Sequence, residues 1–150
     1  MNGVNIRASS TFRPGNIAAI QQSVVLRAVN AVTKGTELVK SEAQTLCPVD
    51  TGELRASIAS EVALRGSLVT GTVYATAPHA AFVEFGTGLI GRGTYPFALP
   101  QSGVPYTGSW VYDFRGRGWK GMPAKPYMRP ALDGAGPQII GFFREEGFQV

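Results

Sequence analysis

An apolar stripe of helical period runs through residues 16–46 and constrains the fold more than any other feature of the sequence. The stripe consists of Ile17, Ile20, Val24, Ala28, Val32, Val39, Ala43 and Leu46, and it is widened by Val25, Val29 and Leu38. Apolar side chains at this spacing share one face of an α-helix. The pattern predicts one amphipathic helix that Pro14 can start, that Gly35 disturbs and that Pro48 ends. Such a helix is roughly 45 Å long, which is long for a domain of 150 residues.

A second, short helix is predicted over residues 52–57, just after Pro48. Either Asp50 or Thr51 can cap it, because both side chains carry an oxygen that accepts a backbone N–H. Glu53 would reach back to the cap residue, as in a capping box. Gly52 permits a tight turn between the two helices.

The hydrophobic period changes over residues 58–76, where apolar residues flank Arg65-Gly66-Ser67. This pattern predicts a β-hairpin with a glycine turn. Residues 79–86 then suit one or two helical turns ended by Gly86. Glu84 lies between apolar neighbours there and has two interpretations: an exposed point on the short helix, or a structural salt bridge or interface anchor. A buried carboxylate would need a base or a backbone N–H as its partner.

Residues 86–125 are predicted to form a long loop insertion that is dense in Gly, Pro and aromatic residues, with a short hairpin around residues 109–114. The side chains with which this region would bind a neighbour, or face a lumen, are Arg92, Trp110, Arg115, Arg117, Trp119, Lys120 and Arg129. Arg and Trp anchor many protein interfaces, and basic residues among aromatic ones also occur in single-stranded nucleic-acid binders. We favour a protein interface, and a solvated loop tip and direct nucleic-acid contact are the alternatives.

The last element is predicted as a helix over residues 130–146, interrupted near residues 134–137. Pro126 and Pro130 would hold the chain extended as it enters this helix. The apolar face of the helix would consist of Ile139, Ile140, Phe142 and Phe143.

Few residues suit catalysis or metal binding, because His79 is the only histidine and Cys47 the only cysteine. A Cys47–His79 nucleophile pair is the one catalytic alternative. However, Cys47 ends an apolar helical stripe, where a buried and inert thiol is expected. The carboxylates show no spacing typical of a metal loop or an acid–base pair. We therefore predict no catalytic, metal-binding or cofactor-binding residues.

The net charge of +4 and the isoelectric point near 9.5 are mildly basic. They permit contact with nucleic acid or with an acidic protein surface, without requiring either. The sequence has no run of 18 apolar residues and no signal-peptide pattern at its N-terminus, so we expect no membrane span and no export signal.

Three segments in order resemble the head–tail joining, or neck and tail-completion, proteins of long-tailed bacteriophages. They are residues 47–58 (CPVDTGELRASI), residues 74–87, which end in FVEFGT, and residues 126–132 (PYMRPAL). The motif positions that carry the resemblance are Asp50, Thr51, Gly52, Leu54, Glu84, Gly86, Thr87, Pro126 and Pro130. Two features depart from the family pattern: Cys47 replaces a commoner small residue, and the loop after the second segment is long.

The resemblance implies an α+β fold, with a long N-terminal helix and a C-terminal helix packed on a small antiparallel sheet, in a single domain over residues 1–150. It implies a structural virion protein without enzymatic activity or cofactor, assembled in the host cytoplasm. The protein would form a ring at the head–tail junction, a hexamer rather than a dodecamer, through which the genome passes. Its neighbours would be the head connector or stopper and the tail terminator or tail tube. The alternatives are another virion ring, such as a tail terminator or stopper, a nucleic-acid-binding module and an enzyme.

Overall fold

The computed structural model describes residues 15–87 and 121–150 of the chain. Its elements are α1 (Gly15–Leu46), α2 (Glu53–Ala56), β1 (Ile58–Arg65), β2 (Leu68–Ala75), α3 (Ala80–Phe85) and α5 (Met128–Glu145). The two strands form one antiparallel sheet. The predicted α+β fold with two long helices and a small sheet is therefore confirmed. The predicted loop falls mostly on residues 88–120 and, like the hairpin expected around residues 109–114, lies outside the described residues.

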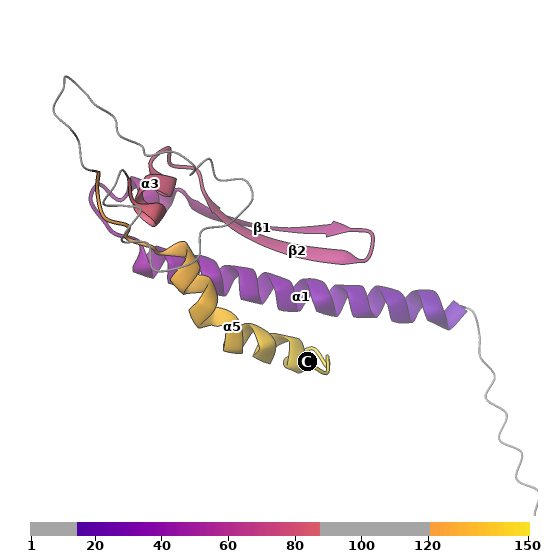
Figure 1. The fold of residues 1–150 in the computed structure, drawn as a ribbon. Coiled ribbons are helices and arrows are strands. Elements are labelled where there is room, and N and C mark those ends of the chain that lie inside the picture. Colours follow the sequence, from indigo (N-terminus) through magenta and orange to yellow (C-terminus); the bar gives the residue numbers. More distant parts are fainter. Residues whose placement is uncertain (1–14, 88–120) are drawn as a thin grey trace, which may run out of the picture.

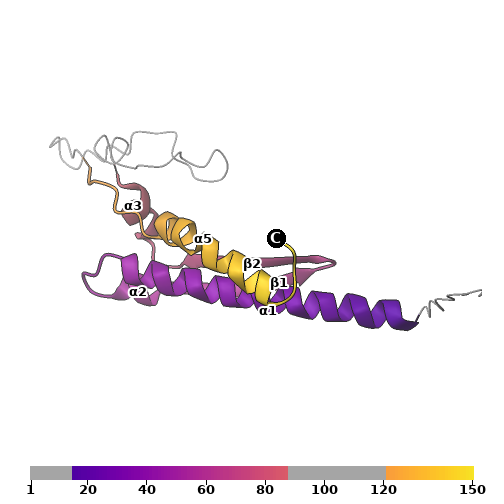
Figure 2. The same ribbon diagram turned by 90° about the horizontal axis from the view of Figure 1, so that it is seen from below.

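Helix α1 is the element on which the hairpin and helix α5 pack. Both strands of the hairpin and helix α5 contact it, and Figures 1 and 2 show them lying along two different sides of it. The core consists of Val39, Ala43, Cys47, Leu54, Ile58, Ala77, Tyr127, Ala131 and Ala135. These residues come from α1, α2, β1, α5 and the segments between them, so the core gathers around the C-terminal half of α1.

The predicted disturbance of α1 at Gly35 is wrong, because α1 is one continuous helix of 32 residues. Gly35 is buried where α5 crosses α1, and a Cβ atom there would lie 3.2 Å from Cγ1 of Ile139. The absence of a side chain at this position therefore allows the two helices to approach closely rather than breaking one of them.

The hairpin has the predicted form, with Arg65 paired to Leu68 across a two-residue turn and Ile58 paired to Ala75 at its base. Gly66 in the turn has φ 61°, a left-handed conformation that glycine adopts readily. Gly71 in β2 faces α1 at very close range. A Cβ atom at Gly71 would overlap with Oγ1 of Thr36 in α1, so this strand can approach the helix this closely only with glycine at that position.

The predicted cap of the second helix is wrong. The N-cap residue of α2 is Gly52, with φ 83° and no side-chain cap hydrogen bond. Thr51 has a smaller role, because its Oγ1 accepts the backbone N–H of Glu53 at 3.4 Å. The short helix is therefore entered through the left-handed turn at Gly52 and not through a capping box.

The predicted entry into the last helix is also wrong. Helix α5 begins at Met128, so Pro130 lies in its first turn rather than in an extended segment. A proline is tolerated there because the first N–H groups of a helix have no partner within it. The expected interruption is absent as well: α5 continues through Pro137, which is exposed, so the carbonyl left without a partner can face water.

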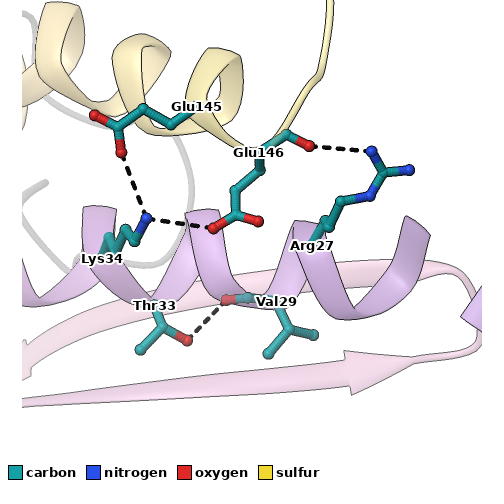
Figure 3. A network of polar contacts seen from close by, with 6 residues as sticks. All are labelled: Arg27, Val29, Thr33, Lys34, Glu145 and Glu146. Atoms are coloured by element: carbon teal, nitrogen blue, oxygen red, sulfur yellow. Dashed lines mark hydrogen bonds and ion pairs between the residues drawn. The ribbon is translucent and has the colours of Figure 1, made fainter. Parts of the chain in front are cut away.

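Polar contacts attach the C-terminal end of α5 to α1 (Figure 3). Nζ of Lys34 lies 3.4 Å from Oε2 of Glu145 and 3.3 Å from Oε1 of Glu146. Arg27 donates from Nη1 to the backbone carbonyl of Glu146 at 3.2 Å, and its guanidinium lies 5.7 Å from the ring centroid of Phe148. The pKa of Lys34 is raised, and the largest cause is the hydrogen bond that its Nζ donates to Glu146. Because the side chains of Lys34 and Glu145 are largely exposed, their ion pair adds little to stability.

Candidate functional site

The carboxylate of Glu84 caps the N-terminus of α5. Its Oε2 accepts the backbone N–H groups of Tyr127 at 2.7 Å and Met128 at 3.0 Å, and its Oε1 accepts that of Arg129 at 3.2 Å. These are among the N–H groups that a helix start leaves without an internal partner. The Glu84 side chain comes from α3 and its residue is only 6% exposed. Of the two interpretations of Glu84, the exposed point is therefore wrong, and its partners here are backbone N–H groups.

The sequence contains the reason for this arrangement. A carboxylate in a buried position is stable only when several donors satisfy it, and the first turn of α5 offers three in one direction. No side chain of α5 caps its own N-terminus, and Tyr127 occupies the N-cap position without a side-chain hydrogen bond. Glu84, which lies in α3, therefore supplies the cap that no side chain near the start of α5 provides, and its hydrogen bonds join α3 to α5.

The two ends of residues 88–120 are held together next to this cap. Thr87 and Met122 exchange two backbone hydrogen bonds of 3.0 and 3.1 Å, and Oγ1 of Thr87 accepts the N–H of Met122 at 3.0 Å. The N–H of Lys125 donates to the carbonyl of Val83 at 2.8 Å. Gly86 has φ 72°, which turns the chain from α3 toward this bridge. The motif residues Glu84, Gly86 and Thr87 therefore connect α3 to both the bridge and α5.

A groove of about 710 Å³ lies between the hairpin and α5. Its walls are formed by β2, α3 and α5, and its floor is formed by α1; we call it the α1–β2–α5 groove. Its lining residues are Val32, Gly35, Thr36, Val39, Gly71, Thr72, Val73, Ala75, Ala80, Ala81, Glu84, Phe85, Tyr127, Met128, Arg129, Leu132, Ile139 and Phe143. Most of these side chains are apolar, and Leu132 on the α5 wall is 51% exposed. The groove can accept an apolar partner.

The N-terminal end of α1 extends past the tip of the hairpin and past the end of α5 (Figure 1). Residues 17–24 are all exposed. The apolar side chains among them and just after them are exposed by 38% at Ile17, 57% at Ile20, 36% at Val24 and 60% at Leu26. This stretch, residues 17–26, is called the α1 end below. Within the described residues, the members of the apolar stripe that are buried are Val39 and Ala43, which lie in the C-terminal half of α1.

A second hollow, of about 440 Å³, is lined by residues 48–54 together with His79, Val83, Met122 and Lys125. It therefore brings together the Asp50-Thr51-Gly52 motif, with Asp50 and Thr51 exposed, and the single histidine. Leu54, at 5% exposure, also belongs to the core. Burial raises the pKa of the Cys47 thiol, an effect that Arg55 partly offsets. Cys47 is only 4% exposed, which supports the interpretation of an inert thiol.

Of the predicted interface residues, the structure describes only Arg129. It lies in the first turn of α5, where its Nε donates to both carboxylate oxygens of Asp133 at 3.0 and 3.1 Å. Arg92, Trp110, Arg115, Arg117, Trp119 and Lys120 lie outside the described residues. Pro126 lies in the irregular segment just before α5. The structure thus brings Glu84, Gly86, Thr87 and Pro126 together around the start of α5, and it places Asp50, Thr51 and Gly52 at the second hollow.

Sequence reasoning missed the α1–β2–α5 groove and the significance of the α1 end. The groove has no sequence signature, because its residues come from four elements. The α1 end does have one: from residue 17 to residue 26 the helix carries apolar and uncharged polar side chains and no charge at all. A solvent-exposed helix usually carries charged residues on its outer face, so this absence could have marked the segment as a contact surface.

Within residues 15–87 and 121–150, no group of three or more His, Cys, Asp or Glu residues is arranged to hold a metal ion. Among the helices of that same part of the chain, none is both long and apolar enough to span a membrane.

Residues 15–86 match a family of phage proteins, HK97-gp10_like, described as "Bacteriophage HK97-gp10, putative tail-component". The match begins at the first residue of α1 and ends at Gly86, so it includes the hairpin, α3, Glu84 and the Asp50-Thr51-Gly52 turn. No curated protein and no solved structure matched the chain. The segment that contains the α1 end, the hairpin and the capping carboxylate thus matches the model of the HK97-gp10-like bacteriophage family.

Proposed function

We propose that this protein is a structural virion component that forms a ring at the phage head–tail junction. It joins the head connector to the tail and leaves a channel for the passage of DNA. The family match over residues 15–86 supports a role in the tail region of a phage. The structural observation that carries the proposal is the exposed α1 end, where a charge-free helical segment presents Ile17, Ile20 and Leu26 outside the chain's own core.

Physical chemistry supports assembly as the role of that segment. Apolar surface in water costs roughly 25 cal/mol per Å², so a subunit gains free energy by covering it. Soluble monomers rarely keep such surfaces uncovered, and uncovered ones commonly mark contacts with other proteins. We infer a structural rather than a catalytic role for the same reason: the most distinctive features of the described residues are surfaces, and the single cysteine is buried.

The description of the family as a tail component favours one alternative, in which the ring terminates the tail instead of joining it to the head. Both roles need a closed ring around the genome. They differ in the neighbour that the ring contacts, and the location of the protein in the particle separates them. A role of Arg92, Arg115, Arg117 and Lys120 in the contact with a neighbouring subunit is part of the proposal, since Arg anchors many protein interfaces.

The test is a phage in which the gene for this protein carries an early stop codon, propagated with and without a plasmid that supplies the intact protein. Without the plasmid, we expect DNA-filled heads and separate tails in electron micrographs, and loss of infectivity. Particles complemented with a labelled protein should show the label at the junction. Complete and infectious particles made without the protein would overturn the proposal. A label confined to the free end of tails, with heads already sealed, would establish the tail-terminating alternative.

A further inference from the structure

We propose that the α1 end of one subunit lies in the α1–β2–α5 groove of a second copy of this chain. This inference rests on the proposed ring-forming function and specifies the contact by which the ring closes. The two surfaces are on the same chain and are both uncovered within the described residues: residues 17–24 are all exposed, and Leu132 in the groove wall is 51% exposed.

The chemistry of the two surfaces matches. The α1 end carries no charged residue between Ile17 and Leu26, so it can enter an apolar groove without the desolvation of an ion. The groove offers no uncommitted carboxylate, because Glu84 already accepts three backbone N–H groups. At the rim, Arg129 is paired with Asp133. A charged peptide or a nucleic acid would find no partner in the groove, whereas an uncharged helix fits it.

The dimensions agree as well. At about 1.5 Å per residue, the α5 wall between Met128 and Phe143 is roughly 22 Å long, and the α1 end is roughly 14 Å long. In length, the groove can therefore accommodate one side of the α1 end lying along α5. Ile17, Ile20 and Val24 are spaced by three and four residues, so they form one edge of the helix and can all point into the groove at once.

The contact joins two different surfaces, so it is heterologous, and a repeated heterologous contact closes into a ring when its rotation permits. Covering one side of such a short helix buries roughly 300 Å² per partner, well below the roughly 800 Å² per partner of a stable complex. A single contact is therefore weak. We expect the free subunit to be monomeric or weakly associated, and the ring to close where subunits are held together on an assembling particle.

Disulfide trapping in the purified protein tests the contact even if it is weak. Two single-cysteine proteins are made in a Cys47→Ala background, one with Ile20→Cys and one with Leu132→Cys, and both positions are exposed. The matched control is Leu68→Cys at the hairpin tip, which is 65% exposed and belongs to neither surface. Thermal unfolding confirms that each variant is folded before mixing at a high protein concentration under mild oxidation.

We expect a disulfide-linked dimer from the mixture of Ile20→Cys with Leu132→Cys, at least about tenfold more than from Leu68→Cys with Leu132→Cys. Three results would overturn the inference. The first is no excess of the mixed dimer over the control. The second is a dimer from Ile20→Cys alone in larger amount, which would mean that two α1 ends pair with each other. The third is a Leu132→Cys protein that, in phage particles, links only to a different virion protein.

A second measurement separates failure of this contact from failure of the proposed function. Ile20→Asp, Leu132→Asp and the control Leu68→Asp are supplied by plasmid to the phage that lacks the intact gene. We expect the first two to lower the yield of infectious particles by about 100-fold and the control by less than about threefold. Normal yields with all three variants would exclude the α1 end and groove as the ring contact. If the wild-type plasmid is still required, that result leaves the protein's role at the junction intact.

Discussion

Oε2 of Glu84 and the backbone nitrogen of Tyr127 lie 2.7 Å apart, although the two residues are 43 positions apart in the sequence. This hydrogen bond joins the two sides of the segment that the structure leaves undescribed, residues 88–120. Because the same carboxylate also accepts the N–H groups of Met128 and Arg129, the position of α5 relative to α3 depends on one side chain.

Replacement of Glu84 should destabilise the fold in proportion to the acceptors lost. Glu84→Gln keeps one accepting oxygen and removes the charge, and we expect it to lower the free energy of unfolding by about 1–2 kcal/mol. Glu84→Ala leaves three backbone donors without this partner, and we expect a loss of about 3 kcal/mol. Urea unfolding measures both. Glu42→Gln, at an exposed position of α1, is the control and should change stability by less than about 0.5 kcal/mol. Equal effects of all three substitutions would contradict the capping role.

Two glycine-to-alanine substitutions should act in opposite directions. At Gly71 the new Cβ atom would meet Oγ1 of the buried Thr36 and Cγ1 of Val32, so the hairpin must move away from α1. We expect a loss of about 1–3 kcal/mol in unfolding free energy. At Gly134, inside α5, nothing lies within 4 Å of the new atom. Alanine there should raise stability by about 0.5–1 kcal/mol through helix propensity. Chemical denaturation of both variants measures the two changes in unfolding free energy. A Gly71→Ala variant more stable than the wild type would refute the close approach of β2 to α1.

Tyr127 should make the fold sensitive to alkaline pH. Burial, and to a lesser extent the nearby Cys47 and Glu84, raise the pKa of its phenol well above the usual value of about 10. The unfolded chain releases this proton at about pH 10, whereas the folded chain retains it. The contribution of Tyr127 to the free energy of unfolding is therefore complete below pH 10 and falls above it. The slope is about 1.4 kcal/mol per pH unit. Unfolding free energies measured at pH 9 and pH 11 should therefore fall more for the wild type than for Tyr127→Phe. The same fall in both proteins would show that Tyr127 is not the group responsible.

The thiol of Cys47 should be unreactive in the folded protein. It is 4% exposed, and burial raises its pKa, so the thiolate fraction near pH 8 is small. We expect modification by a disulfide reagent to be at least about 100-fold slower than for a Leu68→Cys variant and to accelerate to the same rate in 6 M urea. Rapid modification of native wild-type protein would show that the thiol is accessible and would reopen its reading as a nucleophile.

The sequence predicted most of the elements because their signals are local. The apolar stripe over residues 16–46, the glycine turn of the hairpin at Gly66 and Gly86 at the end of α3 each depend on a few neighbouring residues, and each prediction is confirmed. The errors come from contacts that no local pattern contains. Gly35 was predicted to disturb α1, whereas the side chain of Ile139 in α5 packs against α1 where Gly35 has no side chain. Pro130 looked like part of an extended segment, whereas Glu84 supplies the cap that lets the helix begin before it.

Part of the candidate site was likewise identified from the sequence, and part of it depends on tertiary contacts. The motif residues Asp50, Gly52, Glu84 and Thr87 were identified from their resemblance to a phage family, and the structure assigns physical roles to Gly52, Glu84 and Thr87. The α1–β2–α5 groove could not be predicted, since it exists only once β2 and α5 lie beside each other on α1. The six loop residues proposed as an interface lie outside the described residues and stay a prediction.

The overhang of α1 also has a consequence for the behaviour of the isolated polypeptide. Its first turns lie outside the core of the described residues, and β-branched Ile17, Ile20 and Val24 have only moderate helix propensity. Amide protons there should exchange with solvent faster than those beyond Ala31, where the helix is buried. In the assembly that we propose, the terminal turns would lose conformational entropy when a neighbour covers them, and this loss would oppose premature polymerisation while the subunits are still dilute in the host cell.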